Sequence, residues 1–216
     1  MAEAGRAVAA VGGRRRKPRR RRPPEVLTAG EVGRLLAACP PSAHGLRNRA
    51  LIALMYRSGL RVSEALALCP KDVDAHAGTV RVLHGKGDRS RTVGIDAGGV
   101  AVLAAWLEAR EAAGAQPGDP IFFGRGGRPL DAGYVRRVFQ QLGARAGIAK
   151  RVHPHGLRHT HAAELRSEGV DIGIISKQLG HRSITTTACY LDHIAPVAVV
   201  EAVKARRWQP RLNEGS

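Results

Sequence analysis

The sequence predicts a mainly α-helical fold with a small antiparallel β-sheet, that is, an α+β fold. Most of the chain after residue 26 carries apolar residues at helical spacing, separated by residues that start and end helices. Two short β-rich runs on either side of a Gly-rich turn are the exception, and they predict a hairpin. The chain has 216 residues, of which 44% are hydrophobic, so it can bury the core of one domain with appendages.

Local signals mark where the helices begin and end. Thr28 and Glu31 have the spacing of a capping box, which predicts a helix running to about Ala38. Gly59 follows an apolar stripe and is typical of the left-handed residue that ends a helix. The predicted helices cover residues 29–38, 46–58, 61–68, 98–113, 131–146, 156–168, 171–179 and 183–191, and a last one ends near Trp208.

The hairpin is the predicted sheet. Its strands are expected at residues 79–83 and 91–95, and the turn between them covers residues 84–90. We interpret the short apolar run at residues 120–123 as a further strand.

The charge balance indicates a polyanionic partner. Lys and Arg total 35 against 18 acidic residues, which gives a net charge of +17. Residues 1–24 account for +8 of it and are interpreted as a disordered Arg-rich arm, so residues 25–208 form the folded domain and residues 209–216 a tail. The remaining +9 makes the body basic too, as in a nucleic-acid binder, although ribosomal and other basic proteins share this property. The arm residues expected to bind DNA are Arg14, Arg15, Arg16, Lys17, Arg19, Arg20, Arg21 and Arg22.

Cysteine usage and hydropathy favour an intracellular protein. Cys39, Cys69 and Cys189 are too far apart for a disulfide framework or a CxxC metal site. The sequence contains no apolar run long enough to cross a bilayer. We therefore expect a cytoplasmic, nucleoid-associated protein.

Two stretches in the first half of the chain hold polar residues that packing does not explain. Arg61 and Glu64 are i,i+3 neighbours at a helix start, so the carboxylate can orient the guanidinium; a plain surface ion pair has the same pattern. Lys86 lies at the tip of the Gly-flanked turn, where it can reach a neighbouring cleft or simply be exposed.

Two further stretches lie in the second half. His155 and Arg158 share a face of a helix start and can address one phosphate. A metal site is the competing interpretation, because His159 and His161 are close by, but no acidic or cysteine partner accompanies them, so packing is preferred for His159. His181 follows a helix-ending glycine, and a tyrosine lies nine residues later; such a tyrosine alone is more often structural.

Together these residues resemble the tyrosine recombinases, also called phage-type integrases. The resemblance covers residues 26–207, and its most specific part is the run HPHGLRHTHA…LGHRSITTTACY. The matching motifs are Arg61 with Glu64, Lys86 in a GKGxxxR turn, His155-x-x-Arg158, Leu179-Gly180-His181, and Tyr190. The resemblance implies the catalytic-domain fold of that family, with Arg61 and Arg158 as phosphate clamps, Lys86 and His155 as acid/base groups, His181 as a further phosphate donor, Tyr190 as nucleophile and Glu64 in support of Arg61.

The implied reaction is cleavage and rejoining of DNA strands through a 3′-phosphotyrosyl bond at Tyr190, without ATP. The sequence lacks the carboxylate clusters with which metal-dependent nucleases hold divalent ions, so no cofactor and no metal is expected. The partners implied are double-stranded DNA and further copies of the chain, as a tetramer on DNA. Residues 195–207 either dock into a neighbouring protomer, as the family suggests, or pack within the chain.

Two features depart from the family pattern. Only about 25 residues precede the catalytic region, where most integrases carry another helical DNA-binding domain, so the chain resembles the short fimbrial-inversion recombinases or is a fragment of a longer integrase. Gly94 stands where the family usually has proline, which is expected to matter little. The competing functions are strand relaxation by a type IB topoisomerase and DNA binding by a truncated integrase that has lost catalysis.

Overall fold

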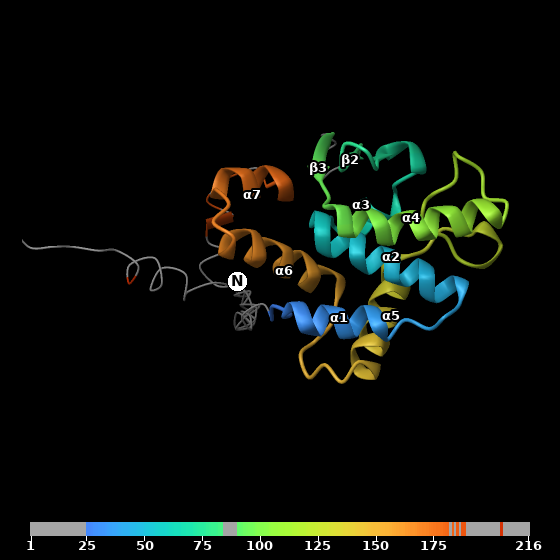
Figure 1. Ribbon diagram of the computed structural model, residues 1–216, viewed down its shortest axis with the longest axis horizontal. Helices are drawn as coiled ribbons and strands as arrows, with labels where there is room; N and C mark the ends of the chain where they lie inside the picture. The colour runs from blue at the N-terminus through green and yellow to red at the C-terminus, as the bar shows by residue number, and fades with distance from the viewer. Residues whose placement is uncertain are drawn as a thin grey trace, which may run out of the picture.

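The computed structural model describes residues 25–83 and 90–181, together with Ser183, Thr185, Thr187, Ala188 and Lys204. Helices dominate this part of the chain, and a small sheet lies at one end of it (Figure 1), so the predicted α+β class is confirmed. The helices are α1 Ala29–Ala37, α2 Ala43–Ser58, α3 Val62–Leu66, α4 Ala97–Ala112, α5 Ala132–Arg145, α6 Pro154–Ser167 and α7 Ile172–Leu179, with short 3₁₀ turns at Pro70–Asp72 and Arg125–Gly127. The strands are β1 Val73–Asp74, β2 Thr79–Val82 and β3 Arg91–Gly94.

Helix α2 is the centre of the fold and packs against both α4 and α6. It begins at Ala43, three residues before the predicted start, because Ser42 caps it by accepting a hydrogen bond from the backbone N of Gly45 at 3.2 Å. Leu51, which is 2% exposed, is typical of this helix, whose second half is buried on nearly all sides. The predicted end at residue 58 agrees with the structure, whereas the start depends on the Ser42 cap and not on apolar periodicity.

Arg47 is a buried charge near the start of α2 that ties two later segments to it. Its side chain is 1% exposed. The guanidinium donates to the carbonyl O of Phe123 at 2.9 Å, to the hydroxyl of Tyr134 at 2.9 Å and to Asn48 Oδ1 at 2.8 Å. These bonds satisfy the buried charge. An unpaired buried ion costs on the order of several kcal/mol of stability.

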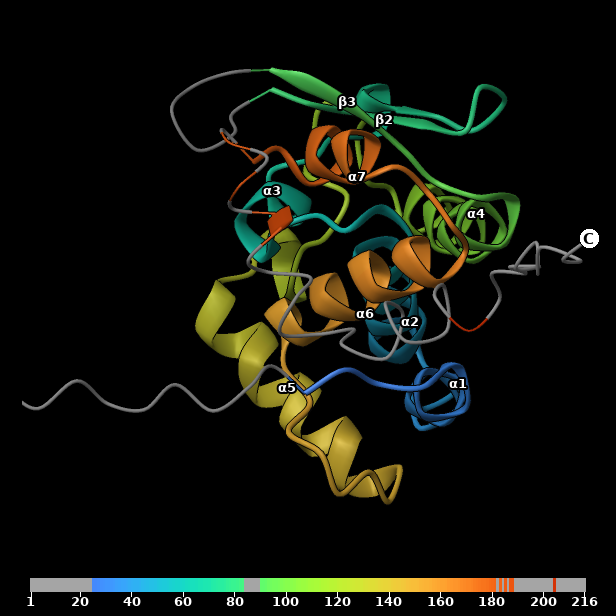
Figure 2. The same ribbon diagram turned by 90° about the vertical axis from the view of Figure 1, so that its left-hand side faces the viewer.

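The predicted hairpin is confirmed, with Val80 paired to Val93 across β2 and β3. Strand β1 adds a third, antiparallel strand through Val73 opposite Val80. Two residues are too few to show an alternating pattern, so β1 could not be predicted from periodicity. The sheet lies beside α7 (Figure 2).

The prediction of a strand at residues 120–123 is wrong. The structure has only an isolated bridge between Phe123 and Pro129 there. Ile121 is fully buried, and its backbone N donates to the carbonyl O of Leu68 at 2.7 Å, while its carbonyl O accepts from the indole N of Trp106 at 2.8 Å. The apolar run is therefore a buried connection whose backbone is satisfied by single partners rather than by a ladder.

The capping box at the start of α1 is present. Glu31 Oε2 accepts from the backbone N of Thr28 at 2.7 Å, and Thr28 Oγ1 accepts from the backbone N of Glu31 at 3.2 Å. Lys150 also donates to Glu31 Oε2 at 2.7 Å, and the backbone N of Leu27 donates to Thr160 Oγ1 at 3.0 Å. These bonds fix α1 against α6 and the segment that precedes it. Within the described ranges, no helix is both long and apolar enough to span a membrane.

Candidate functional site

The turn between α2 and α3 positions the first predicted pair. Gly59 ends α2 in the left-handed region at φ 66°, and Arg61 is the N-cap residue of α3. Glu64 accepts hydrogen bonds from the Arg61 backbone N at 2.9 Å and from its Nη1 at 2.7 Å. The Glu64 side chain is 2% exposed, whereas that of Arg61 is 28% exposed. The predicted ion pair is present, and the burial of its carboxylate distinguishes it from a plain surface pair.

Arg91 on β3 is a second partner of Glu64, and it was not among the predicted site residues. Its Nη1 and Nη2 each donate to a different oxygen of Glu64, both at 2.9 Å. Burial alone would raise the pKa of Glu64, but the hydrogen bonds from Arg91 and from the backbone N of Arg61 outweigh it and lower this pKa to about 2. The arginine of the GKGxxxR turn is Arg91, so the motif contained the residue but not its partner, 27 positions away.

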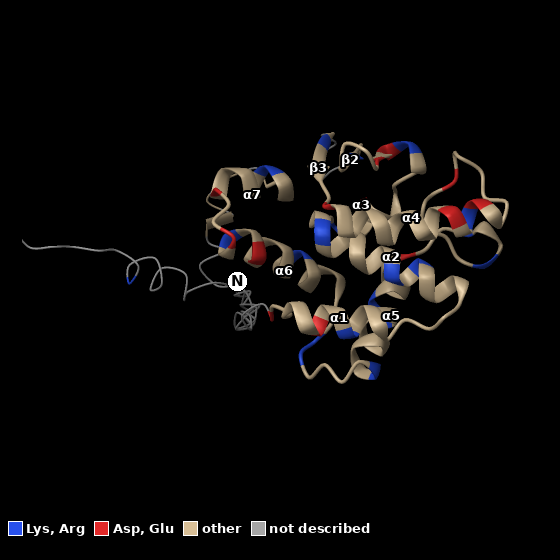
Figure 3. Ribbon diagram, viewed as in Figure 1, with Lys and Arg blue, Asp and Glu red and all other residues tan. Residues whose placement is uncertain are grey.

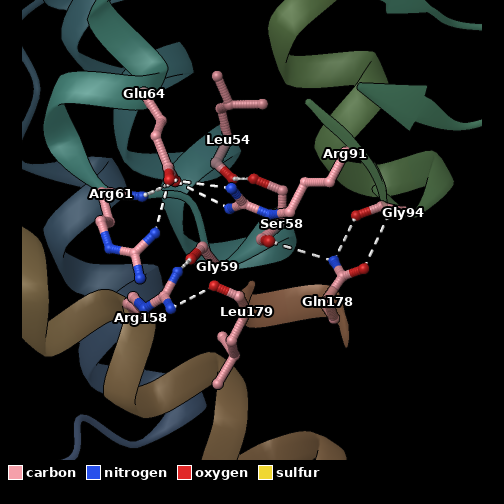
Figure 4. Close-up of polar contacts among 10 residues, drawn as sticks. All are labelled: Leu54, Ser58, Gly59, Arg61, Glu64, Arg91, Gly94, Arg158, Gln178 and Leu179. Carbon is pink, nitrogen blue, oxygen red and sulfur yellow. Dashed lines mark hydrogen bonds and ion pairs between the residues drawn. The ribbon is translucent and has the colours of Figure 1, made fainter. Parts of the chain in front are cut away.

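Arg158 on α6 lies on the other side of the same turn. Its side chain is 1% exposed. Nη1 donates to the carbonyl O of Gly59 at 2.6 Å and Nη2 to that of Leu179 at 2.5 Å (Figure 4). These carbonyls lie at the C-terminal ends of α2 and α7, where helix dipoles concentrate negative charge that favours a cation. Arg158 therefore joins three helices and is fixed by backbone atoms alone in these two contacts.

The start of α6 is defined by His153, which was not among the predicted site residues. Its Nδ1 accepts a hydrogen bond from the backbone N of Gly156 at 3.1 Å, so a neutral imidazole serves as the N-cap. Pro154 occupies the first turn, where its missing N–H is not needed. The signal was available: a polar residue directly before a proline at a helix start is typical of a cap. This cap fixes the first turn of α6 and therefore determines where His155 and Arg158 lie.

The histidines of α6 are held neutral. His155 is exposed and contacts the ring of His159 edge to face, with centroids 4.4 Å apart. Partial desolvation and the nearby positive charge of Arg158 lower the pKa of His155. Burial lowers the pKa of His159 to about 3 and that of His161 to about 4. His159 is thus a packing residue behind His155, as expected, and no group of three potential metal-ligating residues occurs in the described part of the chain.

His181 follows the end of α7, where Gly180 adopts φ 64°. Its Nδ1 forms a hydrogen bond of 2.7 Å with the hydroxyl of Thr187, which is fully buried and so fixes the ring orientation. Burial, and then the positive charges of Arg158 and Arg61, lower the pKa of His181 to about 4. The imidazole is therefore neutral at physiological pH and lies within the electrostatic reach of both arginines.

An amide clamp connects α7 to the hairpin. Gln178 Oε1 accepts from the backbone N of Gly94 at 3.0 Å, and its Nε2 donates to the carbonyl O of Gly94 at 2.8 Å and to that of Ser58 at 3.1 Å (Figure 4). The expectation that Gly94 matters little understates its role, because a residue without an N–H would lose one of these bonds.

The structure thus brings five of the predicted site residues to one region, between the α2–α3 turn, the start of α6 and the end of α7. They are Arg61, Glu64, His155, Arg158 and His181. Lys86, Tyr190, the arm at residues 14–22 and the segment 195–207, apart from the helical Lys204, lie outside the described residues.

Comparison with known proteins identifies relatives for most of the chain. Residues 25–195 match the model of the phage integrase family. Tyrosine recombinase XerC of Xanthomonas axonopodis pv. citri is 38% identical over 188 residues, which is 85% of this chain and 60% of the relative. Tyrosine recombinase XerC of Xylella fastidiosa is 42% identical over 167 residues, or 77% of this chain and 55% of the relative. The chain therefore spans only about 55–60% of the length of these curated relatives.

Solved structures of recombinases share the fold. The crystal structure of XerA recombinase matches with a TM-score of 0.76 and 32% identity, covering 87% of this chain and 68% of that one. XerH site-specific recombinase, in a post-cleavage complex with its difH substrate, matches with a TM-score of 0.70 and 29% identity over 85% of this chain and 54% of that one. With the family model covering more than half of its residues, this chain belongs to the phage integrase family.

Proposed function

We propose that this chain is the catalytic part of a site-specific DNA recombinase that cleaves and rejoins strands through a covalent bond from Tyr190 to a backbone phosphate. The observation that carries the proposal is the placement of two arginines, Arg61 and Arg158, on either side of one turn, with the neutral imidazoles of His155 and His181 nearby. Relatives named tyrosine recombinases, and a recombinase structure in complex with DNA, support it.

The two arginines answer the main electrostatic difficulty of the reaction. A phosphodiester repels an incoming nucleophile, and negative charge grows on its non-bridging oxygens as the fifth bond forms. Guanidinium groups stay charged at any relevant pH and bind phosphate oxygens with two parallel donors. Glu64 holds Arg61 through one guanidinium nitrogen, Nη1. Among the described residues Glu64 is the partner of this guanidinium, so its other N–H groups can face a phosphate. Arg158 is held at a fixed position beside it by the two helix ends.

The neutral histidines provide a second kind of group. An imidazole with a lowered pKa carries one N–H donor and one acceptor nitrogen at neutral pH. We assign His181 as a donor to a non-bridging oxygen, because its ring is oriented by Thr187. His155, which is exposed beside Arg158, is assigned the acid/base role and can accept the proton that the nucleophile loses.

Tyr190 and Lys86 complete the proposed reaction. The phenol has a reference pKa of about 10, so it must transfer its proton as its oxygen attacks phosphorus. A bond forms between that oxygen and phosphorus, and the bond from phosphorus to the 5′ oxygen breaks. Lys86 is assigned as the acid that protonates the departing 5′ oxygen. The 3′-phosphotyrosyl ester conserves the bond energy, so the reverse attack by a 5′ hydroxyl restores the strand without ATP.

We propose that double-stranded DNA is the partner and that four copies of the chain bind it as a tetramer. Basic residues occur on several elements of the described chain, α2 and α5 among them (Figure 3). Exposed arginines include Arg136 and Arg137 on α5 and Arg125 and Arg128 in the preceding segment. These side chains are free to contact phosphates without reading sequence, and the Arg-rich arm at residues 1–24 is proposed to do the same.

The test is covalent capture of DNA. The full chain is incubated with nicked duplexes that cover its own flanking DNA, and adducts that survive detergent are separated by gel electrophoresis. The adduct is expected with the unmodified chain and absent with Tyr190→Phe. Tyr56→Phe and Tyr134→Phe are matched controls, because these tyrosines are engaged with Glu164 and Arg47 and should leave the adduct intact. An adduct that persists in Tyr190→Phe would show that another residue is the nucleophile.

A further inference from the structure

We infer that Arg91 is a positioning residue for strand cleavage: it shares the buried carboxylate of Glu64 with Arg61 and so keeps Arg61 available to the scissile phosphate. The inference rests on the proposed function. It deepens that function by assigning to a strand residue, distant in sequence, control over a phosphate clamp.

The geometry of the carboxylate is the first support. Glu64 receives four hydrogen bonds from two arginines: two from Arg91 at 2.9 Å each, one from the Arg61 backbone N at 2.9 Å and one from Arg61 Nη1 at 2.7 Å. Arg91 thus occupies both oxygens with its fork, and Arg61 reaches only one of them through its guanidinium. Figure 4 shows both arginines directed at the one carboxylate from opposite elements, β3 and the α2–α3 turn.

Charge provides the second support. Arg61 and Glu64 alone would be a neutral pair, whereas Arg61, Glu64 and Arg91 together carry one net positive charge. The side chain of Arg91 is 15% exposed and that of Arg61 is 28% exposed, so Arg61 is the more accessible of the two cations. Without Arg91, both oxygens of a buried carboxylate would be open to the fork of Arg61, and a bidentate pair is the stronger arrangement. Arg61 would then turn toward Glu64 and away from the phosphate.

Arg91 also supports the turn that leads to His181. A Cβ atom built at Gly180 would lie 2.7 Å from Arg91 Nε and 2.8 Å from its Cζ. The backbone of the turn therefore lies directly against the guanidinium, and only glycine permits this approach at φ 64°. One arginine side chain consequently contacts both the support of Arg61 and the turn before His181.

The first experiment measures the carboxylate without DNA. The full chain is labelled with ¹³C at glutamate side chains, and the Glu64 signal is identified by its absence in Glu64→Gln. Arg61 and Arg91 face Glu64 directly, and Arg158, His155 and His181 are the other charged or titratable groups of the region.

An ordinary glutamate titrates within roughly pH 3 to 6. In the unmodified chain, Glu64 is expected to stay ionised across this range, because its pKa is lowered. In Arg91→Gln the pKa of Glu64 should rise into this range, because even a bidentate pair with Arg61 leaves one guanidinium fewer to offset the burial of the carboxylate. A Glu64 signal that titrates alike in both proteins would overturn the inference. Arg91→Lys keeps the charge without the fork and gives an intermediate midpoint; it also replaces the glutamine variant should that variant unfold.

The second experiment measures cleavage of the nicked duplex at saturating DNA. Arg91→Gln is expected to lower the cleavage rate by about 10- to 100-fold, as small displacements of a positioned group do. Arg81→Gln is the matched control: it removes the same charge from the neighbouring strand, is exposed, and contacts Asp72 rather than Glu64. Because the DNA is saturating, differences in DNA affinity do not enter the rate, so the rate separates positioning from charge loss.

The double variant Arg91→Gln with Glu64→Gln gives the sharpest outcome. Removing the carboxylate restores the net positive charge and releases Arg61, so part of the lost rate should return. A purely structural role for Arg91 predicts a further loss instead, and that result, or equal rates for Arg91→Gln and Arg81→Gln, would overturn the inference. Absence of any adduct with the unmodified chain would refute the proposed function itself, which keeps the two failures distinguishable.

Discussion

Gly59 should tolerate no side chain, and the reason lies in both its backbone and its surroundings. Its φ of 66° costs an alanine roughly 1–2 kcal/mol, offset by about 0.4–1 kcal/mol from the reduced entropy of the unfolded chain. A Cβ atom there would lie 2.6 Å from His161 Cδ2 and 3.0 Å from Leu179 Cδ2. Overpacking of this kind costs typically about 1–3 kcal/mol. We therefore expect Gly59→Ala to lower the free energy of unfolding by roughly 2–4 kcal/mol.

Gly147→Ala is the matched control for this prediction. Gly147 has a φ of 63°, and no atom lies within 4 Å of a Cβ built on it. Gly147→Ala has the same backbone cost but makes no close contacts. It should therefore lower the free energy of unfolding by about 1–3 kcal/mol less than Gly59→Ala does. Urea unfolding followed by circular dichroism measures the free energy of unfolding of both variants. In thermal melts, Gly59→Ala should lower Tm by roughly 5–15 °C for a chain of this size. Equal losses for the two variants would refute the packing argument.

Three further predictions concern other parts of the chain. Gln178→Leu removes the clamp on Gly94 and should lower the free energy of unfolding by about 1–2 kcal/mol in urea; a change under about 0.5 kcal/mol would contradict it. Deleting residues 1–24 should weaken DNA binding and flatten its salt dependence, measured by fluorescence anisotropy, and an unchanged slope would exclude the arm from phosphate binding. Stability should fall as the pH drops from the ordinary histidine pKa of 6.5 to about 4, because folded His161 binds a proton less readily than the unfolded chain; His161→Gln should reduce this slope in pH-dependent thermal melts.

Local signals explain why the helices were predictable. Thr28 and Glu31 form their capping box within four residues, and Gly59 and Gly180 end helices through their own backbone conformation. Such features depend on neighbours in sequence, so they can be read before the fold is known. The error at residues 120–123 has the opposite origin, since an apolar run is buried whether or not another strand pairs with it.

The candidate site divides in the same way. The pair of Arg61 and Glu64 follows from i,i+3 spacing, and its geometry agrees with the prediction. Arg91 could not be assigned from spacing, because 27 residues separate it from Glu64 and only the packing of β3 beside α3 brings them together. The carbonyl partners of Arg158 were equally hidden, since backbone acceptors leave no residue type to recognise.

The two arginines that we propose bind phosphate are held in place by different means. Arg61 is held by a full negative charge, which would cancel its own if Arg91 did not share the carboxylate. Arg158 donates to carbonyl groups at two helix ends, whose partial negative charges help to fix the guanidinium. A site that must bind an anion and stabilise growing negative charge needs cations that are fixed but not neutralised. Sharing one carboxylate between two arginines, and donating to the carbonyls of two helix ends, are two ways to hold a guanidinium in place.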